Sequence, residues 1–222
     1  MRTFATPTPV SAVLDIPAGH IRFIAADRAD TTVEIRPADA SSARDLRAAE
    51  QIEVGYADGE LRIAAPAPKS RILGAPGSVE VTVRLPAGSR VEAKAALAEF
   101  RGVGRLGDVV LEAAQATVRL DETAGARVSL QSGDISLARL GGPAEISTQK
   151  GDLLITEAVR GKVTLRTEHG DITVGAARGV SATLDAGTAY GRIGNTLRNA
   201  EEGPGLEIHA TTSYGDITAR SL

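Results

Sequence analysis

The chain has 222 residues, of which 42% are apolar and 24% charged, a balance typical of a globular protein. It contains no cysteine, which excludes disulfides, thiolate metal sites and a cysteine nucleophile. Its formal net charge of −3 provides no basic field that would attract nucleic acid or an anionic membrane. Aromatic residues make up only 3% and tryptophan is absent, so the core must be built mainly of aliphatic side chains.

The sequence also lacks targeting and cofactor signals. Its first residues have no apolar run of the kind a signal peptide needs, and no stretch approaches 18 consecutive apolar residues. No phosphate-cradling loop and no Gly-x-Ser-x-Gly turn occurs. We therefore expect a cytoplasmic protein with no membrane span, no cofactor and no small-molecule substrate.

Residues 1–90 are predicted to form an irregular β region. The mostly apolar segment Val13–Ile16 is predicted to be a strand that ends at a Pro-Ala-Gly turn. Further on, Ala57-Asp58-Gly59 separates two short alternating segments, which predicts a hairpin. Residues 41–50 are the one candidate helix, because good helix formers follow a serine or aspartate that can cap them.

Residues 64–78 contain three prolines and are expected to form an exposed loop. Lys69 and Arg71 lie in this loop and are the best candidates in the sequence for contact with an acidic partner. A loop whose basic residues are simply solvated is the alternative.

The second half of the chain repeats a short phrase: Gly-Asp, an aliphatic residue, a spacer and another apolar residue. Gly191-Arg192 and Ala116-Thr117 fit the same slot with other residues. The slots recur at intervals of 17 to 24 residues, so loops of different length are inserted into one repeating unit. The four full copies are Gly133-Asp134, Gly151-Asp152, Gly170-Asp171 and Gly215-Asp216.

Each unit also has a second alternating segment before its Gly-Asp turn, as at Val163-Thr164-Leu165. A two-strand unit of this length cannot form its own core and must stack on its neighbours. The sequence therefore predicts an all-β fold, a β-solenoid or β-helix-like stack of short repeats over residues 91–222. The region 1–90 should cap or continue the stack, in one continuous structural unit with one short helix. The far end of the stack is expected around residues 217–222.

These features resemble a known family. The turn Leu85-Pro86-Ala87-Gly88, the hairpin at 56–59 and the serial Gly-Asp-Ile strands are similar to the bacterial β-strand-repeat family of unknown function labelled "putative adhesin". The resemblance extends from about Val10 to Arg220. It implies a repetitive β fold, with some relatives tethered to membranes and linked to envelope-stress systems. It brings no catalytic residues with it.

The recurring aspartates allow two interpretations. Asp134, Asp152 and Asp171 can form a column of carboxylates, with rungs about 4.8 Å apart, that binds a cation such as Ca²⁺. Alternatively, each aspartate satisfies backbone donors of its own turn, which the sequence favours because the calcium-binding nonapeptide spacing is absent. His20, His169 and His209 are far apart, so no shared metal site is expected.

We expect a non-catalytic interaction or scaffold protein, because no reactive residues cluster on its extended repeat surface. Its partner is another protein or a second copy of itself, and Tyr190 and Tyr214, in equivalent slots, belong to the candidate contact surface. The alternative is a carbohydrate-binding or carbohydrate-active β-helix, for which Asp152, Asp171 and Glu168 are the candidate carboxylates.

Overall fold

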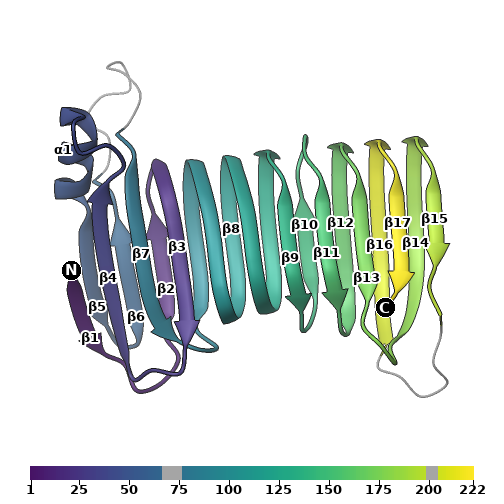
Figure 1. Cartoon of the computed structure of the whole chain (residues 1–222), viewed down its shortest axis with the longest axis horizontal. Coiled ribbons are helices and arrows are strands. Elements are labelled where there is room, and N and C mark those ends of the chain that lie inside the picture. The colour runs from purple at the N-terminus through teal and green to yellow at the C-terminus, as the bar shows by residue number, and fades with distance from the viewer. Residues whose placement is uncertain (67–76, 199–204) are drawn as a thin grey trace.

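The computed structural model describes residues 1–66, 77–198 and 205–222, and it shows an elongated stack of short coils (Figure 1). Strands of successive coils pair side by side, and the chain advances along the stack as it winds. The predicted all-β stack of short repeats with one short helix is confirmed. Lys69 and Arg71, predicted as a partner surface, lie outside the described residues.

The N-terminal part of the stack mixes parallel and antiparallel pairs. β2 and β3 pair in parallel with the start of β8, whereas β4 pairs antiparallel with β1 and with β7. The elements of this part are β1 (Arg2–Ala5), β2 (Ser11–Asp15), β3 (Ala18–Ala26), β4 (Asp30–Pro37), α1 (Ala43–Gln51), β5 (Glu53–Ala57), β6 (Glu60–Ala64) and β7 (Val79–Pro86).

The predicted hairpin and helix are both present. β5 and β6 pair antiparallel around Asp58 and Gly59, whose φ angles of 49° and 80° belong to a tight turn. The predicted helix begins at Ala43, because Ser42 caps it and accepts a hydrogen bond from the Asp45 amide at 3.3 Å. α1 packs beside β4 and β7 at the N-terminal end of the stack (Figure 1).

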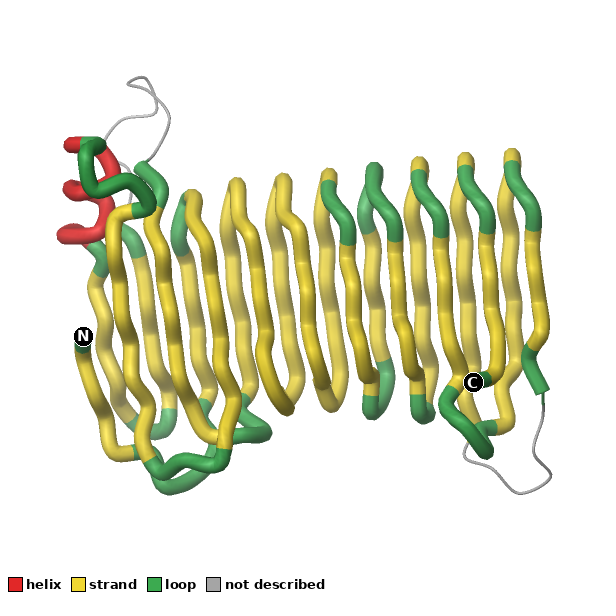
Figure 2. Tube along the Cα trace, viewed as in Figure 1, coloured by secondary structure: helices red, strands yellow, loops and turns green. Residues whose placement is uncertain are grey.

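The C-terminal part consists of parallel pairs. It begins with β8 (Arg90–Ser132), 43 residues long, which bends round several corners as one continuous strand (Figure 2). The segment contains one further Gly-Asp phrase, at Gly107-Asp108, where the strand continues round the corner. The remaining strands are β9 (Ile135–Leu140), β10 (Ala144–Ser147), β11 (Leu153–Ala158), β12 (Gly161–His169), β13 (Ile172–Ala176), β14 (Ser181–Tyr190), β15 (Ile193–Thr196), β16 (Gly205–Tyr214) and β17 (Ile217–Ser221).

The inward side chains form continuous apolar columns. Ile135, Leu153 and Ile172 are in register on adjacent strands, and each is at most 1% exposed. The core is aliphatic, as the composition requires, apart from a ring pair near the N-terminal end. There Phe23 and Phe100 are completely buried, with ring centroids 5.6 Å apart.

The last two coils stack out of chain order. β16 lies between β12 and β14, and β17 lies between β13 and β15. The expectation that the stack ends at residues 217–222 is therefore wrong, because its outermost coil is formed by β14 and β15 (Figure 1).

Two residues account for this order. Asn195 pairs with Ala219 at an inward position of the apolar columns. Its Oδ1 accepts the Leu197 amide at 3.0 Å, but burial between two apolar neighbours would leave its NH2 group without an acceptor. Arg192 occupies the aspartate slot of the repeat. With the C-terminal coil inserted, both residues lie in the outermost coil and the aspartates are contiguous.

Candidate functional site

Glycine is required at the Gly-Asp corners by a close approach of backbones. Gly170 has a φ angle of +151°, and a Cβ atom there would lie 2.1 Å from the Gly151 carbonyl oxygen. Gly151 and Gly215 have the same crowding, with backbone oxygens 2.2 and 2.0 Å from the Cβ position. A side chain is excluded sterically, and the conformation favours glycine independently.

The aspartates bind backbone amides of neighbouring rungs. The Asp152 amide donates to Asp134 Oδ1 at 2.9 Å, the Asp171 amide to Asp152 Oδ1 at 2.8 Å, and the Asp216 amide to Asp171 Oδ1 at 2.7 Å. Each carboxylate thus links two rungs and does not serve only its own turn. Within residues 1–66, 77–198 and 205–222, no group of three or more acidic or histidine side chains is placed to hold a metal ion.

The column of aspartates ends at Arg192. The Arg192 amide donates to Asp216 Oδ1 at 2.8 Å, and its guanidinium lies 3.4 Å from Oδ2 of the same residue. Arginine has no acceptor atom, so the side chain cannot receive an amide from a further rung. The ladder of carboxylate-to-amide hydrogen bonds therefore ends at the outermost coil.

A second column, of threonines, lies inside the same corner and was missed in the sequence. The Thr167 and Thr212 hydroxyls each donate, at 3.1 Å, to the corner glycine carbonyl of the preceding rung. Thr188 does the same to Gly215 at 3.0 Å. The available signal was a threonine three residues before the corner glycines 151, 170, 191 and 215, as in Thr167-Glu168-His169-Gly170.

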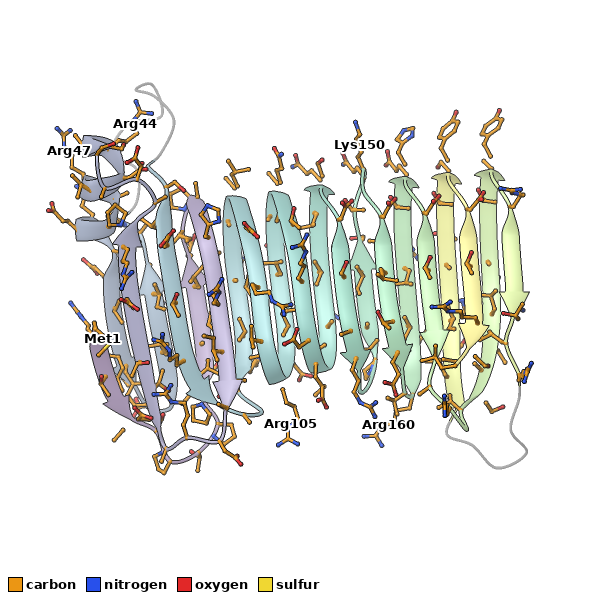
Figure 3. All side chains as sticks on the ribbon, viewed as in Figure 1. Met1, Arg44, Arg47, Arg105, Lys150 and Arg160 are labelled. Carbon is orange, nitrogen blue, oxygen red and sulfur yellow. The ribbon has the colours of Figure 1, made fainter. Side chains whose placement is uncertain are left out.

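The residue before each corner glycine points outward and forms what we call the corner stripe: Lys150, His169, Tyr214 and Tyr190. The His169 and Tyr214 rings stack with centroids 4.9 Å apart and an 8° interplanar angle, and Tyr214 stacks on Tyr190 at 4.9 Å and 5°. The backbone of Lys150 pairs with that of His169 in the next rung, as an isolated parallel β-bridge. The Lys150 side chain projects away from the stack (Figure 3). The structure therefore brings the two predicted tyrosines together.

Two of the carboxylates considered for glycan chemistry take part in bonds between rungs. Asp152 and Asp171 are rungs of the aspartate column and accept backbone amides. In the corner stripe, His169 and Tyr190 each cover one face of the Tyr214 ring.

The three histidines occupy separate places. His20 Nδ1 lies 3.0 Å from Glu99, and His209 lies between Asp185 at 3.2 Å and Glu207 at 2.7 Å. The hydrogen bond from His209 lowers the pKa of the Glu207 carboxyl below its ordinary value. This acidic cluster connects β16 to the outermost strand β14.

Arginines mark the opposite edge of the stack. Arg105 and Arg160 project from the edge away from Lys150 (Figure 3). They flank a shallow groove of about 710 Å³ lined largely by backbone at Gly107, Gly142 and other glycines. The Arg160 Nε donates to the Gly141 carbonyl at 3.2 Å.

The paired strands, glycine corners and apolar columns define an all-β, solenoid-like stack of repeats. The chain belongs to the Toastrack DUF4097 family, whose model matches residues 13–221. The resemblance to a bacterial family labelled "putative adhesin" is confirmed by this match and by solved structures with that label. No helix in the described residues has the length and apolarity needed to cross a membrane.

Among solved structures, a "putative adhesin" from Parabacteroides distasonis ATCC 8503 is 16% identical, with a TM-score of 0.50. The alignment covers 98% of this chain and 95% of that one. A "putative cell adhesion protein" from Clostridium sporogenes ATCC 15579 is 14% identical over 100% and 98% of the two chains, with a TM-score of 0.41. No curated protein matches the chain.

Proposed function

We propose that the protein is a non-catalytic binding scaffold that recognises another protein along its corner stripe. The supporting observation is the stripe itself, a straight row of exposed polar and aromatic side chains on a rigid edge. Tyr190 and Tyr214 are 68% and 51% exposed, although both carry large rings. Exposed tyrosines provide apolar contact area together with a hydroxyl group, and they are enriched at protein interfaces.

The arrangement of polar groups supports a binding role over a catalytic one. The recurring aspartates and threonines are engaged in bonds between rungs, so they build the stack. Solved structures named as adhesins share the fold, which is compatible with binding. Location in the cytoplasm stays a prediction from the sequence.

Site-specific photocrosslinking tests the proposal. Benzoylphenylalanine is introduced at Lys150 or Tyr214 and irradiated in the native cell at normal expression. Matched controls carry the same group at Arg105 or Arg160, on the opposite edge of the stack (Figure 3). We expect one discrete protein adduct from the corner stripe and none from the control edge.

Two results would contradict the proposal. Equal adducts from both edges would show that the stripe has no special role. Adducts to glycan without a protein component would replace the protein partner with the carbohydrate alternative.

A further inference from the structure

The coil formed by β14 and β15 leaves an open end on the stack. Among the described strands, β14 pairs with β16 and β15 with β17, so the outer edge is free of a further strand at residues 184–190 of β14 and along β15. Ile193 is 47% exposed, whereas Ile217 and Ile172 in the same column are 1% and 0% exposed. An edge of this kind is a template for pairing with another strand.

We propose that this open end binds a second copy of the chain, related by a two-fold axis parallel to the strands. β14 of each copy then lies beside β15 of the other, and the two sheets continue across the contact. Since β14 runs toward the Gly191-Arg192 corner and β15 runs away from it, the new pairs are antiparallel. The inference rests on the proposed binding role and adds a second binding surface, the open end, whose partner is another copy of the chain.

Charge complementarity supports this arrangement. A two-fold axis parallel to the strands keeps every residue at its own height, so heights can be counted from the corner. Asp185 is six residues before Gly191, and Arg198 is six residues after Arg192. Asp185 therefore faces Arg198 of the second copy, and the contact occurs twice by symmetry.

The exposures and the inward positions agree with this register. The Asp185 side chain is 80% exposed, and Arg198 is exposed as well. Thr188 and Asn195 are each three residues from the corner, so the Asn195 amide meets the Thr188 hydroxyl of the second copy. The Asn195 Oδ1 already accepts the Leu197 amide, and the Thr188 hydroxyl of the second copy provides an acceptor for its NH2 group.

The same end is poorly suited to a further parallel rung. Arg192 has no acceptor for another amide, and a parallel neighbour would bury Asn195 against an apolar column. The other end of the stack is different in kind, since Phe4 and Tyr56 cover its interior with rings 5.4 Å apart. Contact between like ends uses both copies of the open end and therefore stops at a dimer.

Sedimentation of the purified full chain tests the inference without any partner present. We expect a species of twice 22.9 kDa at high concentration that dissociates on dilution. Asp185→Arg or Arg198→Asp alone should weaken the dimer by at least about tenfold, because like charges then face each other. The double variant should restore it. Glu145→Arg makes the same charge change in the same outward column, three rungs away, and should leave the dimer unchanged.

Engineered cysteines test the register, since the chain has none of its own. Gly187 and Thr196 are each four residues from the corner, and a Cβ at Gly187 meets no atom within 4 Å. The double variant Gly187→Cys/Thr196→Cys should oxidise to a covalent dimer, and neither single variant should do so. Efficient dimerisation of the single Gly187→Cys variant would overturn the proposed axis.

A monomer at every concentration, or a filament, would overturn the dimer. Neither result bears on crosslinking at Lys150, so loss of the dimer and loss of the proposed function are distinguishable. A dimer that survives both single charge reversals would place the contact elsewhere.

Discussion

The two ends of the stack differ in what covers their last strands. At the N-terminal end the pairing turns antiparallel, α1 packs beside β4, and the Phe4 and Tyr56 rings cover the interior. At the other end, the coil of β14 and β15 has the same form as the coils before it, and only single residues differ. The N-terminal end is covered by additional structure, whereas the far end stays open and departs from the repeat at Arg192 and Asn195.

This difference shows that the spatial order of the coils in a repeat stack can be determined by residues that differ from the repeat pattern. Ile193 and Ile217 would each fit above Ile172, because all three occupy the same slot. Asn195 and Arg192 do not fit a further parallel rung, and they identify their coil as the outermost. The open coil should also be the less stable region, since it packs on one side only.

The largest expected effect is in the N-terminal part. Phe100→Ala should lower the free energy of unfolding by about 3–5 kcal/mol, because it leaves a cavity against Phe23 in a fully buried site. Ile193→Ala in the open coil should cost about 1 kcal/mol or less. Denaturant unfolding of both variants measures the contrast, and equal losses would contradict it.

A corner glycine in the middle of the stack should be nearly as sensitive. Gly170→Ala should destabilise by about 2–4 kcal/mol, because the new Cβ meets the Gly151 carbonyl and the backbone is unfavourable for alanine. Gly187→Ala in the open coil is the matched control. Its Cβ meets no atom within 4 Å, so its unfolding midpoint should stay close to the wild type.

The aspartate column should matter less, and mainly inside the stack. Asp171→Ala removes the acceptor of the Asp216 amide and should cost about 1 kcal/mol in thermal unfolding. Arg192→Ala, at the end of the column, should change stability by less than about 0.5 kcal/mol, since its side chain is 90% exposed. A larger loss at Arg192 would show that the end of the column is structurally important.

The smallest expected effect is a pH dependence at the open end. A carboxylate whose pKa is lowered by folding stabilises the protein above its ordinary pKa and loses that contribution as the pH falls through the lowered value. His209 lowers the pKa of Glu207 below 4.5, so acid should weaken the bond between these two side chains of β16, next to the outermost coil. His209→Ala should flatten the decline of melting temperature below pH 4.5.

The remaining decline in that variant has a source at the N-terminal end, where Arg28 lowers the pKa of Asp30 and Ser41 lowers that of Asp39. An Arg28→Ala control should remove part of it. Identical pH profiles for the wild type and His209→Ala would contradict a role for the histidine.

The sequence predicted the parts of the fold that depend on local chemistry. The Gly-Asp phrase indicated the corners and apolar columns, Asp58-Gly59 the hairpin, and Ser42 the helix start. The order of the last two coils could not be obtained in the same way, because every coil shares one register. The sequence also did not show that each aspartate accepts a backbone amide of the neighbouring rung, because that bond depends on which rung lies next to each turn.

The candidate binding surface was only partly predictable. Tyr190 and Tyr214 were recognised as equivalent, but their chain order does not show that Tyr214 lies between His169 and Tyr190. The open edge was expected at residues 217–222 and lies instead at β14 and β15. Both differences come from the inserted C-terminal coil.

The inserted coil is tested most directly by two engineered cysteine pairs. Thr173 and Thr218 are partners on adjacent strands, about 4.8 Å apart, within the range that a disulfide spans. Thr173 and Gly194 are two rungs apart, at about 10 Å, which is too far. We predict that Thr173→Cys/Thr218→Cys oxidises within the monomer and that Thr173→Cys/Gly194→Cys does not. The reverse result would show that the coils follow chain order and that β14 and β15 are not the open end.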